Sequence, residues 1–314
     1  MTRWLYFAVS LVALFSLTTQ IACSRSYNGF DVADALIPAT QIHLGGPPRD
    51  GIPALDEPRF LAAARADFLQ PGDAVLGLAL HGVAKAYPIA IMNWHEIVND
   101  RFGARAVAVT YCPLCGTGVA FDAHVAGRRL QFGVSGLLYN SDVLLYDRES
   151  ESLWSQLLMK AVSGPLRGRT LTTLPLTHTR WSAWRQQHPD TLVLSTDTGH
   201  RRDYTRDPYA GYEREKGLYF PVTRRSARFH PKERVLGVEV DGAFKAYPFA
   251  ELSRTSGEIQ DRLNGTSLTI RFDAEAQSAT VFDRAGRQLP AVTAFWFAWY
   301  AFHPQTGVYR ASRR

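Results

Sequence analysis

The chain has 314 residues, of which 46% are hydrophobic and 20% are charged. This composition is typical of a globular protein and excludes disordered, collagen-like and polytopic membrane proteins. The formal net charge is +6, but no recognisable nucleic-acid-binding module accompanies the basic residues, so we expect no nucleic-acid partner.

The first 22 residues have the pattern of an export signal. Arg3 precedes an apolar run over residues 4–17, and a short polar stretch then leads to Ala22. A basic start followed by an apolar segment and a small residue at the cleavage site is typical of a secretory signal peptide. We therefore expect residues 1–22 to be removed on export.

Cys23 follows this signal directly, as in the bacterial lipoprotein signals that the segment resembles. The sequence thus predicts that Cys23 is lipidated and that the protein is periplasmic, held at the outer-membrane surface by a lipid anchor. Gln20 stands where a lipobox usually has Leu, so ordinary cleavage after Ala22 is the alternative.

Two pairs of segments indicate an internal duplication. Residues 71–90 match residues 231–250 at 10 of 20 positions, and residues 181–193 match residues 296–308 at 7 of 13 positions. Because the order is preserved, we predict a β-rich α+β fold of two related hairpin and sheet modules, each closed by a short Trp-containing helix. The first module spans 40–195, the connection 196–230 and the second, shorter module 231–310.

The predicted elements follow from apolar periodicity and turn residues. Strands at 75–80 and 83–87 flank His81-Gly82, and Asp241-Gly242 occupies the matching turn of the second module. These dipeptides are typical of tight β-hairpins. The remaining predicted elements, in chain order, are a short helix at 91–99, strands at 106–111, 119–121 and 143–148, and a helix at 181–188.

The second module lacks the cysteines of the first. When residues 109–122 are laid on residues 270–283, Cys112 falls on Asp273 and Cys115 falls on Ala276. If both modules fold alike, a feature present only in the first is not required by the fold. The Cys112-Cys115 pair is therefore the leading candidate for a functional site.

The setting of this pair predicts metal binding. Cys112-Pro113-Leu114-Cys115-Gly116 joins two predicted strands, whereas the CxxC of a thioredoxin begins a helix. A C-P-x-C-G hairpin resembles the knuckle of a rubredoxin or zinc ribbon, in which both sulfurs converge on one metal. No second knuckle follows, so other side chains must complete the site.

His95 is the best third ligand, because it lies on the predicted helix just before the cysteine-bearing strand. Sulfur with imidazole suits copper or zinc. Weaker candidates for the third ligand are His43, His81, His124, Asp142 and Met159.

Two alternatives stay open. The cysteines could serve a periplasmic thiol-disulfide oxidoreductase, or they could form a structural disulfide in a protein that binds an unknown small molecule. The residues predicted to line such a pocket are Tyr139, Asn140, Asp142, Trp154 and Gln156. The sequence shows no motif of a familiar enzyme class, which leaves enzymatic activity undecided.

Several of these stretches together resemble one family, the exported bacterial and archaeal proteins grouped as domain-of-unknown-function family 3179. The resemblance implies an exported protein with a single cysteine-pair motif and supplies no established reaction. The stretches that carry it are residues 45–53, 87–88, 94–99, 110–116, 135–142 and 153–156.

Overall fold

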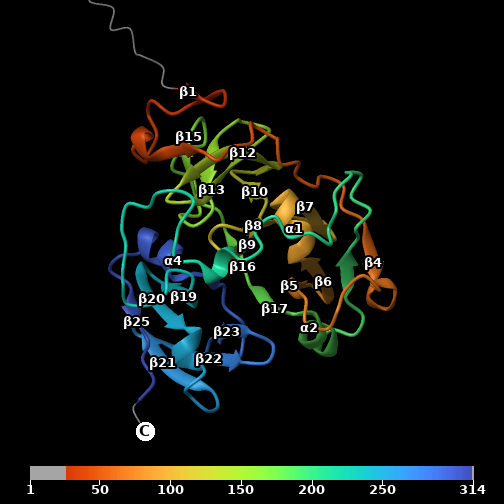
Figure 1. The fold of residues 1–314 in the computed structure, drawn as a ribbon, viewed down its shortest axis with the longest axis vertical. Helices are drawn as coiled ribbons and strands as arrows, with labels where there is room; N and C mark the ends of the chain where they lie inside the picture. The colour runs from red at the N-terminus through yellow and green to blue at the C-terminus, as the bar shows by residue number, and fades with distance from the viewer. Residues whose placement is uncertain (1–25, 313–314) are drawn as a thin grey trace, which may run out of the picture.

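The computed structural model describes residues 26–312 (Figure 1). With 12% of residues in helices and 41% in strands, it confirms the predicted β-rich α+β class. The predicted signal over residues 1–22 and the predicted lipidation site Cys23 lie outside the described residues. Between residues 26 and 312, no helix is long and apolar enough to cross a membrane.

The helices of the described residues are short. The α-helices are α1 (Ile89–His95), α2 (Trp181–Gln187), α3 (Phe249–Leu252) and α4 (Trp296–Phe302). The 3-10 helices are η1 (Ala39–Gln41), η2 (Ala63–Arg65) and η3 (Tyr212–Arg214).

The longest sheet takes strands from both predicted modules, in the order β25-β20-β19-β24-β9-β8-β7, with β16 also paired to β9. Its strands from the first module are β7 (Ile97–Phe102), β8 (Arg105–Cys112), β9 (Thr117–Asp122) and β16 (Thr173–Leu174). Its strands from the second module are β19 (Arg234–Val240), β20 (Ala243–Pro248), β24 (Val292–Phe295) and β25 (Gly307–Val308).

Two further sheets belong to the first module. One has the order β17-β5-β6-β18-β4 and the other β15-β14-β13-β12-β3. The first consists of β4 (Phe60–Ala62), β5 (Ala74–Leu80), β6 (Val83–Pro88), β17 (Leu176–Arg180) and β18 (Leu192–Leu194). The second consists of β3 (Ile42–Leu44), β12 (Phe132–Tyr139), β13 (Asp142–Asp147), β14 (Leu153–Ser155) and β15 (Lys160–Ser163).

The smaller sheets complete the strand inventory. The second module contributes the sheet β21-β22-β23, and two isolated hairpins are β1-β2 and β10-β11. Their bounds are β1 (Ser26–Tyr27), β2 (Phe30–Asp31), β10 (His124–Val125), β11 (Arg128–Arg129), β21 (Ile259–Leu263), β22 (Thr266–Asp273) and β23 (Ser278–Phe282).

Most predicted elements are present. The predicted hairpin forms as β5-β6, and His81 and Gly82 take positive φ values of 52° and 78°, as a tight turn requires. The predicted strands on either side of the cysteines form as β8 and β9. The Trp-containing helices form as α2 and α4.

The helix predicted at residues 91–99 was misplaced at its end. Helix α1 stops at His95 because Glu96 adopts a left-handed conformation with φ 57°, and β7 begins at Ile97. The β-branched Ile97 and Val98 pair with β8 rather than continuing the helix. The reversal of the chain at Glu96 places that residue beside the cysteine-bearing strand.

Corresponding strands of the two modules pair alike. Adding 160 to the residue numbers of β5 and β6, and 115 to those of β17 and β18, converts the residue pairs of the first module into residue pairs of the second. The matching pairs are Val75–Pro88 with Val235–Pro248, Ala74–Arg180 with Arg234–Phe295, and Lys85–Leu192 with Lys245–Gly307.

The modules are interlocked rather than separate. Strand β9 of the first module pairs with β24 of the second through Gly118 and Thr293. In the opposite direction, the backbone N–H of Arg180 on β17 donates to the carbonyl of Ala276, 3.1 Å away, beside β23. The junction of the modules therefore lies next to the cysteine loop, since Phe295 N–H also donates to the Cys115 carbonyl at 2.8 Å.

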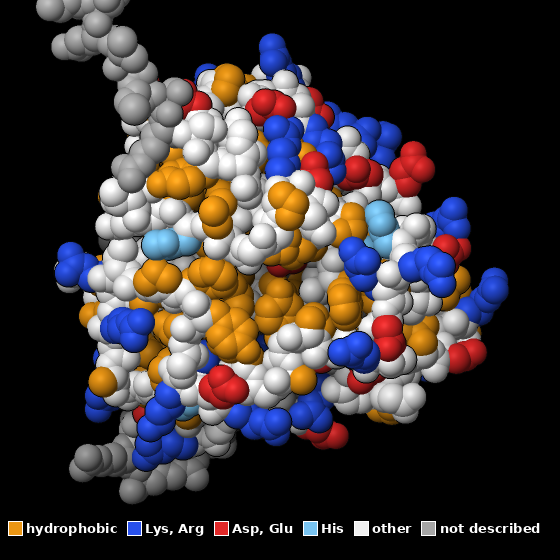
Figure 2. All heavy atoms as spheres, turned by 45° about the horizontal axis from the view of Figure 1, so that its top comes forward, with side chains coloured by type: hydrophobic (Ala, Val, Ile, Leu, Met, Phe, Trp, Pro, Cys, Tyr) orange, Lys and Arg blue, Asp and Glu red, His pale blue; other side chains and the backbone are white. Residues whose placement is uncertain are grey.

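The largest core cluster lies between the β8-β9 hairpin, the sheet of β12–β15 and helix α4, and it includes both cysteines. On the face shown in Figure 2, hydrophobic side chains gather near the middle, while Lys and Arg side chains are spread towards the edge. The positive charge of this face is thus dispersed and does not form one basic patch.

Candidate metal centre

The cysteine loop is a tight turn held by backbone hydrogen bonds. Cys115 N–H donates to the Cys112 carbonyl at 3.2 Å, and Gly116 N–H donates to the Pro113 carbonyl at 3.3 Å. Gly116 has φ +57°, and a Cβ there would lie 2.8 Å from the Phe295 ring. Glycine is therefore required both for the turn and for the approach of the second module. Both cysteines are buried and unbonded to each other.

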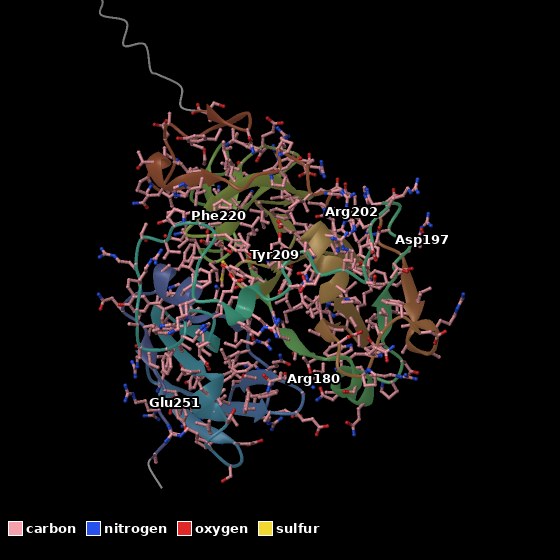
Figure 3. All side chains as sticks on the ribbon, in the orientation of Figure 1. Arg180, Asp197, Arg202, Tyr209, Phe220 and Glu251 are labelled. Atoms are coloured by element: carbon pink, nitrogen blue, oxygen red, sulfur yellow. The ribbon has the colours of Figure 1, made fainter. Side chains whose placement is uncertain are left out.

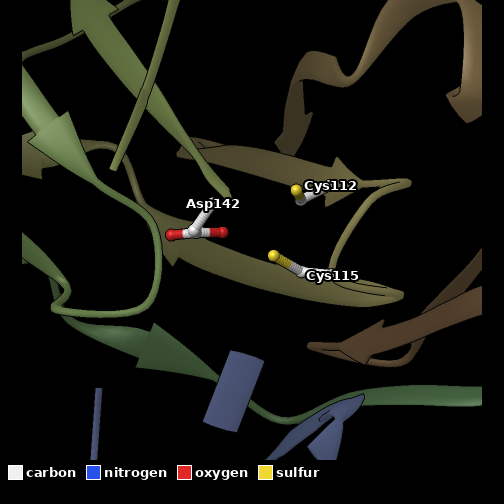
Figure 4. A group of neighbouring side chains, drawn as sticks. All are labelled: Cys112, Cys115 and Asp142. Carbon is white, nitrogen blue, oxygen red and sulfur yellow. The ribbon is translucent and has the colours of Figure 1, made fainter. Parts of the chain in front are cut away.

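Asp142 completes a group with the two thiols. It follows Asn140 and Ser141, whose positive φ values of 52° and 64° reverse the chain between β12 and β13. The ligand atoms of Cys112, Cys115 and Asp142 all lie within 4.8 Å of one another, and all three side chains are buried (Figure 4). The predicted knuckle thus acquires a carboxylate as its third donor.

The Asp142 carboxylate is only half satisfied. Its Oδ2 accepts a hydrogen bond from Leu157 N–H at 3.0 Å. Its Oδ1 is buried and has no hydrogen-bond partner among the described residues. A buried carboxylate oxygen without a donor is costly, and a cation between this oxygen and the thiols would satisfy it. The residues present therefore fit a metal ion.

The electrostatics of the metal-free site favour neutral groups. Burial raises the pKa of Asp142 to about 7, although backbone hydrogen bonds from Leu157 and Val143, and the adjacent Cys115 and Cys112 thiols, oppose the shift. Burial, followed by the charge of Asp142, raises the pKa of Glu96 to about 8. Burial also raises the pKa of the Cys112 and Cys115 thiols. Without a cation the site thus resists forming the three anions that would bind one.

Two further unpartnered polar atoms lie near the thiols. Gln156 donates from Nε2 to Thr110 Oγ1 at 2.8 Å on the cysteine-bearing strand, yet its buried Oε1 has no partner among the described residues. The buried Tyr212 hydroxyl also has no partner there. Burial and the nearby Cys115 and Cys112 raise the Tyr212 pKa. The surroundings of the thiols therefore contain several polar groups whose protein partners are missing.

His95, the predicted third ligand, is not brought to the thiols. Its Nδ1 lies 2.8 Å from the Pro53 carbonyl, and its Nε2 lies 2.7 Å from the Tyr204 hydroxyl. Because a carbonyl can only accept, Nδ1 carries the proton and Nε2 accepts from Tyr204. Burial lowers the pKa of His95 to about 4. Both ring nitrogens are thus engaged away from Cys112 and Cys115.

The other predicted pocket residues separate into two groups. Asp142 and Gln156 face the cysteine region. Trp154 instead donates from Nε1 to Asp147 at 2.8 Å, Tyr139 packs its ring edge-on against Phe302, and Asn140 accepts from Thr223 N–H at 2.7 Å. Of the weaker ligand candidates, Asp142 joins the cysteine group, whereas His43, His81 and His124 are not part of it. Met159 packs against the core cluster that contains both cysteines.

The connection between the modules covers the site, which the sequence did not predict. Figure 3 shows it passing from Asp197 and Arg202 through Tyr209 to Phe220 across the front of the molecule. At its start Tyr204 binds His95, and further along Ser141 Oγ donates to the Phe220 carbonyl at 2.8 Å. The four tyrosines between residues 204 and 219 were the available signal that this segment packs against the protein.

The comparisons with known proteins give a family but no reaction. No curated protein and no solved structure matches the chain. The family described as "Protein of unknown function (DUF3179)" matches residues 49–306, which include the cysteine loop, Asp142, Gln156 and the connection. The match spans most of the sequence and both modules. The chain therefore belongs to the DUF3179 family of proteins of unknown function.

Proposed function

We propose that this protein binds a single metal ion, zinc in preference to copper, through Cys112, Cys115 and Asp142. The observation that carries the proposal is the unpartnered, buried Oδ1 of Asp142 within 4.8 Å of the ligand atoms of two free, buried cysteines. A cation at this position would compensate the carboxylate and both thiolates at once.

The donor set favours zinc. Zinc accepts both thiolate and carboxylate ligands in a tetrahedral arrangement, whereas copper(I) is best served by sulfur alone or by sulfur with imidazole. Two thiolates and one carboxylate carry three negative charges, of which a divalent ion neutralises more than a monovalent one. With His95 as the third ligand, the sequence allowed copper or zinc. With Asp142 as the third ligand, the donor set favours zinc.

Metal analysis of protein purified from the periplasm tests the proposal. We expect about one zinc ion per chain in the wild type and a severalfold lower content in Cys112→Ser and Asp142→Asn, because each removes one ligand. His95→Gln should retain its metal, since both nitrogens of His95 are engaged elsewhere. Equal and substoichiometric metal in the wild type and in both ligand variants would overturn the proposal.

A thiol-disulfide oxidoreductase is the second candidate, and the proximity of the two free thiols supports it. Two observations count against it. A redox-active cysteine needs exposure and a lowered thiol pKa, whereas Cys112 and Cys115 are buried and burial raises the pKa of both. Reversible oxidation of this pair in metal-free protein, with a defined reduction potential, would favour this candidate over metal binding. The remaining alternative is a structural disulfide beside a small-molecule pocket. The structure gives it no support, because Cys112 and Cys115 are not bonded to each other.

We also propose that the protein is exported to the periplasm and anchored to the outer membrane through Cys23. The support is the signal-like segment over residues 1–22. Inhibition of signal peptidase II in the producing cells should shift the gel mobility of the wild type and leave Cys23→Ala unchanged. An unshifted wild type would exclude the lipid anchor.

Finally, we infer that the two modules arose by internal duplication, and that the cysteine site was gained or kept only in the first. The matching strand registers support this inference. So do two equivalent hydrogen bonds, from Trp184 Nε1 to Thr191 at 2.9 Å and from Trp299 Nε1 to Thr306 at 3.0 Å. The sheet of β12–β15, which carries Asp142, has no counterpart in the second module among the described residues.

A further inference from the structure

A cavity of about 270 Å³ lies on the outer side of the cysteine loop. Its walls come from the cysteine loop, from helix α1, from the connection and from the junction of the two modules. The residues that the argument uses are Tyr111, His178, Asp207, Tyr209, Glu213 and Arg234, all of which line it. Figure 3 places Tyr209, on the connection, near the middle of the molecule.

Arg234 brings to this cavity a positive charge that has no ion-pair partner among residues 26–312. It opens β19, where it pairs with Phe295 at the module junction. Its guanidinium lies 5.1 Å from the centre of the Phe249 ring but makes no ion pair or hydrogen bond with any residue between 26 and 312. Burial lowers the Arg234 pKa, whereas the nearby Tyr111 and Glu213 raise it. A partly buried guanidinium without a direct ion pair is an unusual arrangement, because such groups are normally paired.

His178 supplies a second donor. The backbone N–H of Gly118 donates to His178 Nε2 at 2.9 Å, so that nitrogen carries no proton. Burial lowers the pKa of His178 to about 3, so the ring is neutral and its proton resides on Nδ1. Across residues 26–312, Nδ1 has no acceptor. The imidazole is thereby fixed in the tautomer that can donate to a ligand.

The Tyr111 hydroxyl is a third donor without an acceptor in the described part of the chain. Tyr111 precedes Cys112 on β8, and a phenol carries its proton at neutral pH. Its ring centre lies 6.3 Å from that of His178. Three donors of different chemistry therefore line one cavity.

The two acidic residues of the cavity, Asp207 and Glu213, accept no hydrogen bond from these donors. Asp207 Oδ1 already accepts from Asn93 Nδ2 and from Tyr209 N–H, each at 2.9 Å. Glu213 is exposed and forms no ion pair with Arg234. Its charge does act on Arg234, because it raises the Arg234 pKa. Neither acid is therefore hydrogen-bonded to Arg234, His178 or Tyr111.

We propose that this cavity binds a small oxyanion, a carboxylate or a phosphate, through Arg234, His178 and Tyr111. A guanidinium matches the paired oxygens of either group, and neutral N–H and O–H donors complete the set. At roughly 30 Å³ per water, the volume suits a ligand of about ten non-hydrogen atoms or fewer. This proposal goes beyond the proposed metal site and does not depend on it.

The test is a binding titration of the mature protein with inorganic phosphate and, separately, with succinate, at pH 7 and constant ionic strength. We expect saturable binding of one ion per chain by one of the two, which then identifies the class of ligand. Arg234→Gln should weaken that binding roughly 10- to 100-fold, and Tyr111→Phe by about fivefold, as expected for charged and neutral hydrogen bonds. The metal content of each sample should equal that of the wild type.

Two further variants make the result specific. Arg254→Gln removes an exposed arginine that is paired with Glu251, and it should bind the anion as the wild type does. Glu213→Gln removes the negative charge at the rim and should tighten binding by a few fold. The proposal is overturned if neither anion saturates, if Arg234→Gln binds as the wild type does, or if Glu213→Gln binds more weakly. If the purified wild type contains no metal and still binds the anion, this proposal stands. The missing metal then contradicts only the proposed metal site.

Discussion

Asp142 is central to the proposed metal site, because its carboxylate joins the two thiols in one buried group of three possible ligands. Its carboxylate is buried, receives one hydrogen bond from Leu157 and directs an unpartnered oxygen into the thiol region. In the absence of a cation this arrangement opposes folding whenever the carboxylate is charged. Its titration therefore has a measurable effect on stability.

Metal-free protein should lose stability as the pH rises. The folded-state pKa of Asp142 is about 7, well above the value of about 3.9 in an unfolded chain. The folded state therefore binds more protons between these values, and the free energy of unfolding falls as pH increases through this window. At pH 8 the cost is on the order of 4 kcal/mol. Asp142→Asn should remove it.

Urea denaturation of chelator-treated protein at pH 5 and pH 8 measures this effect. Asp142→Asn should be more stable than the wild type at pH 8 and by a smaller margin at pH 5, because Asn can still accept from Leu157. The exposed variant Asp203→Asn serves as the control. A less stable Asp142→Asn at pH 8 would contradict the proposed origin of the pKa shift.

His95 should produce the opposite dependence at lower pH. Its folded-state pKa is about 4, below the unfolded value of about 6.5. The unfolded chain then binds more protons between these values, so stability is lost as the pH falls below 6.5. Between pH 7 and pH 5 the loss due to His95 is up to about 2 kcal/mol.

His95→Gln should therefore lose less unfolding free energy between pH 7 and pH 5 than the wild type does. Urea denaturation at the two pH values measures this difference. The exposed His81→Asn, at a position with φ 52° that Asn tolerates, should leave the slope unchanged. Identical slopes in His95→Gln and the wild type would show that His95 is not the buried neutral group described here.

At the scale of single residues, the sequence predicted the cysteines but ranked Asp142 only among the weaker candidates for their third ligand. The CxxC spacing is local, so Cys112 and Cys115 could be recognised directly. Asp142 lies on a different hairpin, and only the pairing of β12 with β13 brings it to the thiols. His95 was favoured because it is close in the sequence, yet the left-handed turn at Glu96 directs the chain so that His95 contacts Pro53 and Tyr204 instead.

At the scale of elements, each module depends on a glycine beneath a tryptophan. A Cβ on Gly77 of β5 would lie 2.3 Å from the Trp184 ring of α2, and a Cβ on Gly237 of β19 would lie 2.2 Å from the Trp299 ring of α4. These contacts seat each helix directly on its hairpin. The repeated Gly and Trp positions in the two matched segments reflect this packing.

Gly77→Ala should destabilise the protein by about 1–3 kcal/mol, the usual range for overpacking a filled core. The matched control is Gly72→Ala, because a Cβ on Gly72 meets no atom within 4 Å. Thermal unfolding of both variants tests the contact. Equal melting temperatures for Gly77→Ala and Gly72→Ala would show that Trp184 can move away at little cost.

The hairpins were predictable because their signals are local. His81-Gly82 and Asp241-Gly242 have the left-handed conformations that their residue types favour, and the flanking strands form as expected. The end of α1 was not predictable from periodicity. Residues 97–99 fit a helical pattern as well as a strand, and the choice was made by pairing with β8.

At the scale of the whole molecule, the cysteine site lies where three parts of the chain meet. The β8-β9 hairpin supplies the thiols, the sheet of β12–β15 supplies Asp142, and the connection covers both through contacts such as that of Ser141 with Phe220. In the second module the equivalent hairpin is β22-β23, which no such sheet covers among the described residues. This difference explains why only one module holds the candidate site.

Such an arrangement exceeds what sequence patterns can predict. The repeated segments from which we infer a duplication are visible in the sequence, but the pairing of β9 with β24 is long-range and has no local signal. The connection lacks periodicity and was therefore treated as a linker. Its tyrosines become informative only once the thiols beneath them are located.

The most direct test of the central claim is an X-ray absorption spectrum, at the zinc edge, of the protein purified with its native metal. The account predicts two sulfur ligands at about 2.3 Å together with oxygen ligands at about 2.0 Å. The Asp142→Asn variant should lose metal while His95→Gln gives the wild-type spectrum. A spectrum with imidazole scattering, or one with no sulfur ligands, would contradict the assignment of Cys112, Cys115 and Asp142 as the metal site.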